Sequence, residues 1–248
     1  MNNNINDCSI TLYNVHPSML FYHIVPYYYL IIIIIFIIIT YIMYWKCNNL
    51  LNFIRDPEPF DWYQRYSGIR DLINQYVKRE DVILMAGCGN SRLTEDMFED
   101  GYTSITNVDA SRVAIDLMQS RYADKPTLQW QAMNVTALDF PDESFDVVIA
   151  KATFDAVLCG EGSTANIAKF CSEVSRVLKP TGCFFIVSYG VPDNRLNYLE
   201  KEDVYSWTIT VHTVPKPTVS AAAVPSAEDA NGVHYIYVCS KGGSAEEG

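Results

Sequence analysis

A glycine turn and a carboxylate that follows it carry the clearest chemistry in this sequence. The uncharged apolar run 82–86 ends in Gly87-Cys88-Gly89-Asn90, and Asp109 closes a second apolar run 22 residues after Gly87. Glycine at 87 and 89 lets the backbone approach a ligand closely, because a Cβ at either position would intrude. A carboxylate at 109 offers acceptors to both hydroxyls of a ribose. In a parallel sheet both features lie at the same edge, which predicts a site for a nucleoside-bearing cofactor.

The helix that follows the glycine turn argues against a dinucleotide. A dinucleotide fingerprint has a third glycine, three residues after the second, where the helix packs closely and faces a pyrophosphate. This chain has Arg92 there, so NAD and FAD are disfavoured. A ligand with adenosine but no pyrophosphate fits better, and S-adenosylmethionine is the common one. The alternatives are that the glycines only make a tight turn and that Asp109 only caps the helix 111–122.

Alternating strands and helices along the chain would position these residues. Apolar runs predict strands, and apolar residues at helical spacing predict helices. The helix 164–178 should end at the stop signals Lys179-Pro180-Thr181-Gly182. This alternation predicts an α/β fold with a doubly wound, mostly parallel sheet. The last two strands, joined by the loop 213–232, should form an antiparallel hairpin. The predicted helices are 61–77, 91–100, 111–122 and 164–178, and the predicted strands are 82–86, 104–108, 127–132, 145–150, 183–188, 205–212 and 233–239.

Charge and cysteine usage exclude several classes of protein. The chain has 248 residues and a formal net charge of −11, from 18 Lys and Arg against 29 Asp and Glu. Nucleic-acid binding is disfavoured, because neutralising phosphates needs clustered basic residues. An acidic face would suit a basic protein partner, or it would only keep the domain soluble. The seven cysteines include no C-x-x-C pair, so we predict no metal site and no disulfide framework, and a reducing compartment for the folded part.

The N-terminal part of the chain contains a candidate transmembrane helix, 24–45, after a tail over 1–23. The candidate carries no charge, has tyrosines near one end and Tyr41, Tyr44 and Trp45 near the other, and would span roughly 33 Å as a helix. Lys46 and Arg55 follow it, so the globular domain 56–240 is expected in the cytosol. The alternative is that residues 1–55 come from translated non-coding sequence. Residues 241–248 are expected to be a disordered tail.

From about Asp56 to Lys241 the chain resembles the class I S-adenosylmethionine-dependent methyltransferases with a methyltransferase type 11 domain. Within that superfamily it is similar to the elongation factor 1A lysine methyltransferase group, the methyltransferase-like 13 relatives. The motifs that carry the resemblance follow one another along about three quarters of the chain. They are Phe60-Asp61-Trp62-Tyr63, Gly87-Cys88-Gly89-Asn90-Ser91, Val108-Asp109-Ala110-Ser111, Leu138-Asp139-Phe140-Pro141, Phe145-Asp146-Val147-Val148, Lys151-Ala152-Thr153-Phe154-Asp155-Ala156 and Glu173-Val174-Ser175-Arg176-Val177-Leu178-Lys179-Pro180.

The resemblance implies seven strands and a set of cofactor-binding residues. Gly87 and Gly89 would line the methionine moiety, Asp109 would hold the ribose hydroxyls, and Asn134 would meet the adenine amino group. The family more often has Asp at this last position, and Asn134 has an alternative interpretation as a turn residue. Trp62 and Tyr63 would lie over the cofactor pocket, or else belong to the core as residues of a helix. The remaining cofactor-binding residues that the resemblance implies are Cys88, Asn90, Ala110, Val135 and Lys151.

The acceptor side is expected after the strand 145–150, where doubly wound sheets place ligands. Asp155 is our candidate for orienting or deprotonating an acceptor amine, Phe154 for an apolar wall, and Lys151 is placed here by resemblance. The alternatives are that Asp155 is the N-cap of a short helix 156–159 and that Phe154 belongs to the core. The family has glycine where this chain has Ala152, so the turn there is expected to differ.

The leading hypothesis is a protein lysine methyltransferase, with elongation factor 1A as a basic protein substrate suggested by resemblance. A second hypothesis, motivated by residues 24–45, is a small-molecule or lipid methyltransferase held at a membrane. A third, motivated by Asn134 and Ala152, is an inactive cofactor-binding interaction module.

Overall fold

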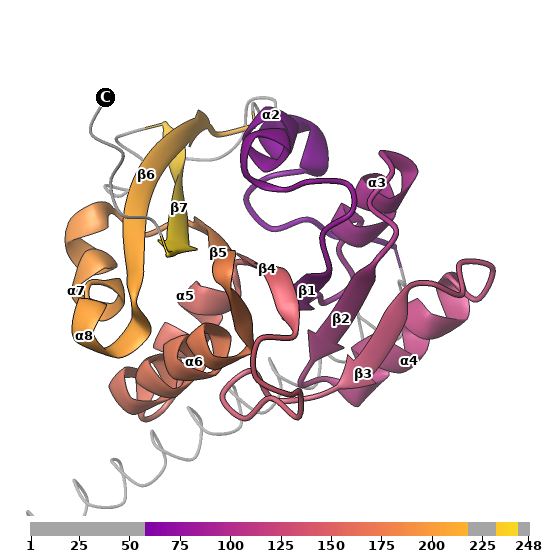
Figure 1. Ribbon diagram of the computed structural model, residues 1–248. Helices are drawn as coiled ribbons and strands as arrows, with labels where there is room; N and C mark the ends of the chain where they lie inside the picture. The colour runs from indigo at the N-terminus through magenta and orange to yellow at the C-terminus, as the bar shows by residue number, and fades with distance from the viewer. Residues whose placement is uncertain (1–57, 218–231, 243–248) are drawn as a thin grey trace, which may run out of the picture. The chain divides into compact units, whose positions relative to one another are not determined.

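Seven strands form one sheet in the residues that the computed structural model describes, 58–217 and 232–242 (Figure 1). They pair in the order β3-β2-β1-β4-β5-β7-β6, and every strand except β7 runs in the same direction. The predicted doubly wound, mostly parallel sheet is therefore confirmed, and so is its closing antiparallel hairpin. The strands are β1 (Ile83–Ala86), β2 (Ile105–Asp109), β3 (Gln129–Ala132), β4 (Phe145–Lys151), β5 (Leu178–Ser188), β6 (Trp207–Pro215) and β7 (Val233–Lys241).

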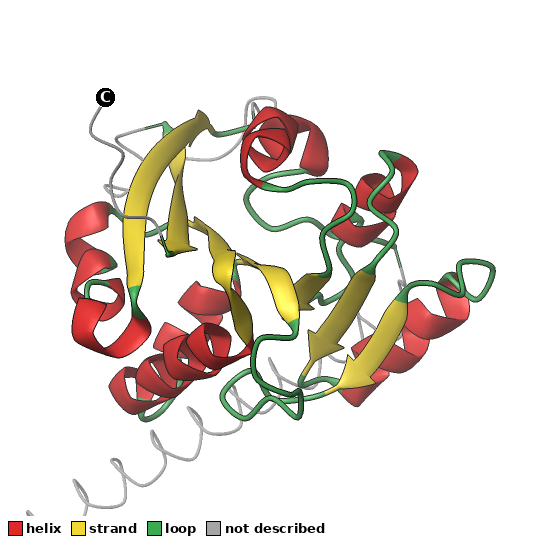
Figure 2. Ribbon diagram, in the orientation of Figure 1, coloured by secondary structure: helices red, strands yellow, loops and turns green. Residues whose placement is uncertain are grey.

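Helices cover both faces of the sheet (Figure 2). One core cluster packs α2, α3 and α4 against the sheet, and the other packs α5, α6, α7 and α8 against the opposite face. Strands β1 and β4 lie between both layers, which is why they are continuous apolar runs. The helices are α2 (Tyr66–Tyr76), α3 (Leu93–Glu99), α4 (Arg112–Arg121), α5 (Thr153–Leu158), α6 (Ser163–Val177), α7 (Leu196–Leu199) and α8 (Glu202–Tyr205), with a 3₁₀ turn over Pro192–Asn194.

The strand order reverses between β1 and β4. The chain leaves β1 toward β2 on one side and returns to β4 on the other, so the connections that follow these two strands diverge. Ligands of open α/β sheets bind at such a point, outside the carboxyl ends of the strands. The glycine turn after β1, Asp109 at the end of β2 and Lys151 at the end of β4 all lie at this edge.

The first described helix begins later than its residue pattern predicts. We expected a helix from 61, whereas α2 begins at Tyr66. Tyr63 has φ +64°, a left-handed conformation that a helix does not contain. Trp62 is 60% exposed, so the interpretation of this side chain as core is wrong.

The residues predicted to end the helix α6, Lys179-Pro180-Thr181-Gly182, do not form a loop. β5 begins at Leu178, directly after the helix, and Lys179-Pro180-Thr181-Gly182 lies inside the strand. Leu178 pairs with Phe145, and the Lys179 ammonium contacts both oxygens of Asp146 at 2.7 and 2.8 Å. A Cβ on Gly182 would lie 2.7 Å from the Asp146 carbonyl oxygen, so glycine is needed for this close pairing. Tertiary pairing thus overrides the local turn chemistry.

Several predictions on the chain termini fall outside the described residues. These are the tail 1–23, the candidate membrane helix 24–45 and residues 243–248 of the predicted C-terminal tail. Within 58–217 and 232–242, no helix combines the length and the apolar character that a membrane span requires. Lys241 is the last residue of β7.

Candidate active site

The two glycines of the turn after β1 have different surroundings. Gly87 (φ +78°) donates its N–H to the Val108 carbonyl at 2.8 Å, and a Cβ there would lie 2.2 Å from the Thr153 hydroxyl oxygen. That hydroxyl donates to the Ala86 carbonyl at 2.7 Å, which clamps α5 against the turn. Gly89 (φ +53°) has no heavy atom within 4 Å of its Cβ position. Gly87 therefore permits close packing of the protein on itself, and Gly89 leaves open space beside the backbone.

Asp109 is held by two backbone donors, one on each carboxylate oxygen. Gly89 N–H donates to Oδ2 at 2.9 Å, and Ser111 N–H donates to Oδ1 at 2.8 Å. The alternative role of Asp109 as a helix cap is wrong, because the N-cap of α4 is Ser111, whose hydroxyl accepts from Ala114 N–H. A carboxylate oxygen accepts two hydrogen bonds, so each retains capacity for a ribose hydroxyl.

The loop after β3 holds the residues expected to meet adenine. Asn134 is exposed, and its side-chain oxygen accepts from both the N–H and the hydroxyl of Thr136 at 3.0 Å. These hydrogen bonds are typical of a turn residue, which is the alternative interpretation of Asn134 from the sequence. Val135 is buried in the core beside β2, and Ala110 is exposed next to Asp109. The adenine contact of Asn134 stays a prediction.

Segment 60–63 (Phe60, Asp61, Trp62, Tyr63) is tied to the end of β4. The Lys151 ammonium donates to Asp61 Oδ1 at 3.0 Å and to the Trp62 carbonyl at 3.1 Å, and the side chains of Lys151 and Asp61 are 5% and 10% exposed. Asp61 also accepts from the Ser91 hydroxyl. Burial lowers the pKa of Lys151, and the Asp61 carboxylate opposes that shift. The ion pair thus fixes segment 60–63 across the switch point.

A small cavity lies between segment 60–63 and the glycine turn. Its volume is about 70 Å³, and its lining includes Trp62, Gly87, Gly89, Asn90 and Lys151. The cofactor contact of Trp62 stays a prediction. The Cys88 side chain is buried in the core, and burial together with the Asp109 carboxylate raises the pKa of its thiol. Only the backbone of Cys88 is therefore available to a ligand.

Asp155 is buried and fully engaged with residues at the end of β5. The Ser188 hydroxyl donates to its Oδ1 at 2.7 Å, and Tyr189 N–H donates to its Oδ2 at 3.1 Å. The Arg195 guanidinium adds two bonds to Oδ1, at 2.6 and 3.0 Å. The N-cap alternative for Asp155 is wrong, because α5 begins at Thr153 and Asp155 lies within it. Arg195 keeps this carboxylate paired and oriented.

Phe154 and Ala152 flank this cluster in different ways. Phe154 has no exposed surface and packs near Phe170 in the core, 6.5 Å between ring centroids. Its role as an apolar wall for the acceptor stays a prediction. Ala152 has φ +66°, the left-handed conformation that favours the glycine found in the family.

Aromatic side chains pack near Asp155. The Tyr63 ring stacks on Tyr189 with 6.3 Å between centroids and 22° between planes, and it lies 5.1 Å from the His234 ring. The Lys216 ammonium lies 5.6 Å from the centroid of the Tyr189 ring. Burial, followed by the charge and hydrogen bonding of Asp155, raises the pKa of the Tyr63 hydroxyl.

Sequence reasoning did not identify several residues of this site. Ser188 and Tyr189 could have been found, because they end an apolar strand at the edge where ligands bind. Asp61 and Thr153 lie within the quoted motifs but received no role. Arg195 and His234 gave no local signal. Among the described residues, no group of three or more His, Cys, Asp or Glu side chains is arranged to hold a metal ion.

Comparisons with known proteins relate this domain to methyltransferases. Residues 84–186 match the family model described as methyltransferase domain. Solved structures share the fold at low identity. The YcgJ protein from Bacillus subtilis gives a TM-score of 0.54 at 18% identity, covering 72% of this chain and 100% of that one. A geranyl diphosphate C-methyltransferase from Streptomyces coelicolor, solved with S-adenosyl-L-homocysteine, gives 0.52 at 14% identity, with 71% and 79% covered.

Two curated relatives that the chain resembles more closely in sequence are both named for eEF1A. EEF1A lysine methyltransferase 4 of Mus musculus is 39% identical over 162 residues, which are 62% of this chain and 63% of that protein. The eEF1A lysine and N-terminal methyltransferase of Bos taurus is 34% identical over 166 residues, which are 64% of this chain and 23% of that protein. The chain thus spans less than two thirds of the length of these relatives. The resemblance stated from the sequence is confirmed.

The residues present fit S-adenosylmethionine, the cofactor of this class. Gly89 leaves open space beside the turn, and both Asp109 oxygens keep acceptor capacity. The position of a third fingerprint glycine is taken by Arg92, which pairs with Glu95 of α3 at 3.1 Å.

Proposed function

We propose that this protein transfers a methyl group from S-adenosylmethionine to a lysine of a basic protein, with elongation factor 1A as the substrate. One observation carries the proposal. The cofactor cradle of Gly89 and Asp109 and the oriented carboxylate Asp155 lie at the same carboxyl edge, on the two sides of the switch point between β1 and β4. A donor and an acceptor held at those two places would meet in a single orientation.

The residues of this chain contribute alignment and electrostatics. The cofactor supplies a methyl group on a sulfonium, and transfer needs an acceptor nitrogen with a free lone pair. A lysine amine is mostly protonated at neutral pH, so a proton must leave before attack. The proton passes to solvent, and Asp155, held by Arg195 and Ser188, provides a fixed negative charge that attracts the amine to this edge of the sheet.

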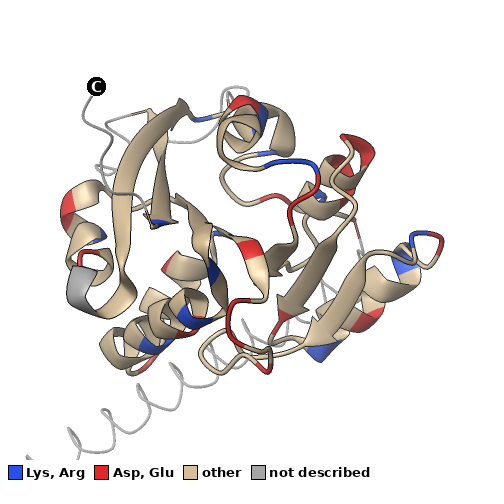
Figure 3. Ribbon diagram, viewed as in Figure 1, with Lys and Arg blue, Asp and Glu red and all other residues tan. Residues whose placement is uncertain are grey.

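Two features support a basic protein as substrate. The relatives at 39% and 34% identity are named for eEF1A. The chain has a formal net charge of −11, and acidic positions gather on α3, which carries Glu95, Asp96 and Glu99 (Figure 3). Charge of this kind favours encounter with a basic partner. The comparisons do not support the lipid methyltransferase or the inactive module as alternatives.

A transfer assay tests the proposal. The full chain is incubated with labelled S-adenosylmethionine and purified elongation factor 1A, and labelled residues are located by mass spectrometry. Label on lysine is expected. No label on elongation factor 1A, with cofactor binding intact, would contradict the substrate. Label recovered in a lipid extract and not in protein would contradict the acceptor class.

A further inference from the structure

Segment 60–63 directs two neighbouring aromatic side chains to different places. Trp62 lines the cavity over the glycine turn, on the β1 side of the switch point. Tyr63 lies instead beside Tyr189, which follows β5, and His234 of β7. The φ of +64° at Tyr63 makes this divergence possible, and such strain in a non-glycine residue is typical of functional sites. The Lys151–Asp61 ion pair and the bond from Lys151 to the Trp62 carbonyl hold the segment in place.

Tyr63 and Tyr189, both half-buried, form an aromatic surface beside a buried anion, and the buried His234 ring packs against Tyr63. The two tyrosine rings are nearly parallel, and the buried carboxylate of Asp155 accepts a hydrogen bond from Tyr189 N–H. Aromatic faces attract ammonium groups, and a nearby carboxylate strengthens the attraction. The chain shows this affinity itself, because the Lys216 ammonium lies over the Tyr189 ring. The surface is therefore suited to a lysine side chain.

Asp155 is poorly placed to contact that lysine directly. Its Oδ1 accepts from Ser188 and Arg195, its Oδ2 accepts from Tyr189 N–H, and the side chain is only 10% exposed. Tyr63 is half-buried where Asp155 is buried, and its hydroxyl is hydrogen-bonded to the same carboxylate. A hydroxyl that donates to Asp155 has lone pairs left to accept from an incoming amine.

We propose that Tyr63 and Tyr189, with the buried His234 ring packed against Tyr63, form the acceptor subsite for a lysine side chain, and that the Tyr63 hydroxyl positions the amine. This inference rests on the proposed function and moves Tyr63 from the cofactor side, where the sequence placed it, to the acceptor side. Asp155, Ser188 and Arg195 act through Tyr63 as positioning residues. The Tyr63 and Tyr189 rings bind the lysine ammonium. Once the ammonium has lost a proton to solvent, the Tyr63 hydroxyl oxygen accepts from an N–H of the neutral amine and so sets the direction of the nitrogen lone pair.

Three variants of the full chain separate these roles. Tyr63→Phe removes only the hydroxyl, and kcat for elongation factor 1A should fall at least tenfold with little change in KM. Tyr189→Leu removes a ring, and KM should rise about 3- to 30-fold with little change in kcat. Tyr198→Phe removes a hydroxyl on α7 and should change neither constant. Calorimetry with S-adenosyl-L-homocysteine should give the same Kd for all four proteins.

Two results would overturn the subsite. One is a kcat within twofold of the parent in Tyr63→Phe. The other is a fall in kcat that is matched by an equal fall in the affinity of Tyr63→Phe for S-adenosyl-L-homocysteine, which would place the Tyr63 hydroxyl in the cofactor site.

A second measurement does not depend on turnover. Saturation-transfer NMR follows binding of Nα-acetyl-lysine methylamide to the S-adenosyl-L-homocysteine-loaded chain. Binding that Tyr189→Leu weakens would support the subsite even if elongation factor 1A received no methyl group. Binding by the parent that Tyr189→Leu leaves unchanged would overturn the subsite alone. Absence of both binding and transfer in the parent would contradict the subsite and the proposed function together.

Discussion

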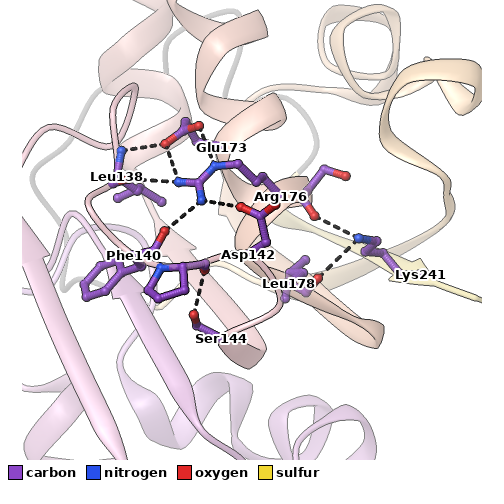
Figure 4. A network of polar contacts seen from close by, with 10 residues as sticks. Leu138, Phe140, Asp142, Ser144, Glu173, Arg176, Leu178 and Lys241 are labelled. Carbon is purple, nitrogen blue, oxygen red and sulfur yellow. Dashed lines mark hydrogen bonds and ion pairs between the residues drawn. The ribbon is translucent and has the colours of Figure 1, made fainter.

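Two arginine–carboxylate clusters lie at opposite edges of the sheet and differ in what they hold. At the carboxyl edge, Arg195 binds Asp155, and both side chains are nearly buried, at 14% and 10% exposed. At the amino edge, Arg176 at the end of α6 binds Glu173 at 2.9 Å and the carbonyls of Leu138 and Phe140 at 2.8 and 2.7 Å (Figure 4). The first cluster fixes a charge beneath an aromatic surface, and the second fixes a loop to a helix.

The same kind of interaction therefore supports function in the Arg195 cluster and stability in the Arg176 cluster. Bonds from Arg176 to backbone carbonyls shape the loop between β3 and β4, and Leu138 N–H returns a bond to Glu173 at 2.7 Å. Arg195 also fits closely, because a Cβ on Gly190 would lie 2.0 Å from its guanidinium carbon. Its bonds, however, end on Asp155, Ser188 and its neighbour Asn194, and not on a distant loop. Mutations in the two clusters should therefore have different consequences.

The largest effect is expected from Asp155→Asn, which should lower kcat about 100-fold, because the Tyr63 hydroxyl that it orients would shift, and a displacement of about 1 Å at the reacting groups has that effect. The matched change at the other edge, Glu173→Gln, should leave kcat within about twofold. Steady-state transfer to elongation factor 1A measures both. Because Arg195 would be left buried without its counter-charge, stability is checked by thermal unfolding. An Asp155→Asn protein that is folded and fully active would contradict the functional role of the Arg195–Asp155 cluster.

The next effect is on stability. Arg176→Met should lower the free energy of unfolding by about 2 kcal/mol, because the carbonyls of Leu138 and Phe140 lose a charged donor. For a domain of this size the Tm should fall by about 4–8 °C. Denaturant titration and calorimetry provide the two values, and kcat at 25 °C should not change. A large loss of kcat in a fully folded Arg176→Met protein would mean that the two edges are coupled.

A smaller effect concerns pH. Hydrogen bonding from Arg176 lowers the pKa of Glu173 below its ordinary value, against an opposing effect of burial. A carboxylate whose pKa is lower in the folded state contributes stability that is present above its unfolded pKa, about 4.3, and is lost as pH falls through the folded value. The free energy of unfolding of Glu173→Gln, measured from pH 7 downward, should thus fall less steeply below about pH 4.3. Identical slopes for parent and variant would contradict this assignment.

The smallest effect is expected at the turn between the two halves of the site. Ala152 has φ +66°, a conformation that costs an L-residue about 1–2 kcal/mol and glycine much less. The greater flexibility of glycine in the unfolded chain offsets about 0.5–1 kcal/mol of this gain. Ala152→Gly should therefore stabilise the protein by about 0.5–1 kcal/mol. Ala165→Gly, on the exposed face of α6, is the control and should destabilise it by about 1 kcal/mol. Equal destabilisation by both would show that residue 152 is not strained.

Features set by local sequence were predicted well. Apolar and aromatic runs located all seven strands to within a few residues, except at the start of β5. For β1 and β4 the reason is that strands buried on both faces contain few polar residues. The glycine turn and Asp109 were also found, since each directly follows such a run. Their hydrogen bond, Gly89 N–H to Asp109, links residues 20 apart that parallel pairing brings together.

Features set by distant contacts were not predicted. Periodicity places Trp62 and Tyr63 in a helix, but Lys151, about 90 residues away, holds this backbone in another conformation. Arg195 reaches Asp155 across 40 residues, from the N-cap of a short helix whose own sequence does not indicate a site. Such contacts arise from the packing of β4, β5 and β7 against one another, which no local pattern encodes.

The central claim is that the turn after β1 and Asp109 bind the nucleoside of S-adenosylmethionine. Calorimetric titration of S-adenosyl-L-homocysteine into the parent, Asp109→Ala and the surface control Asp116→Ala tests it most directly. The account predicts binding by the parent and the control, and a Kd at least about 100-fold higher in Asp109→Ala, because two hydrogen bonds to a charged acceptor are lost. Equal affinity in all three proteins, or no binding by the parent, would contradict it.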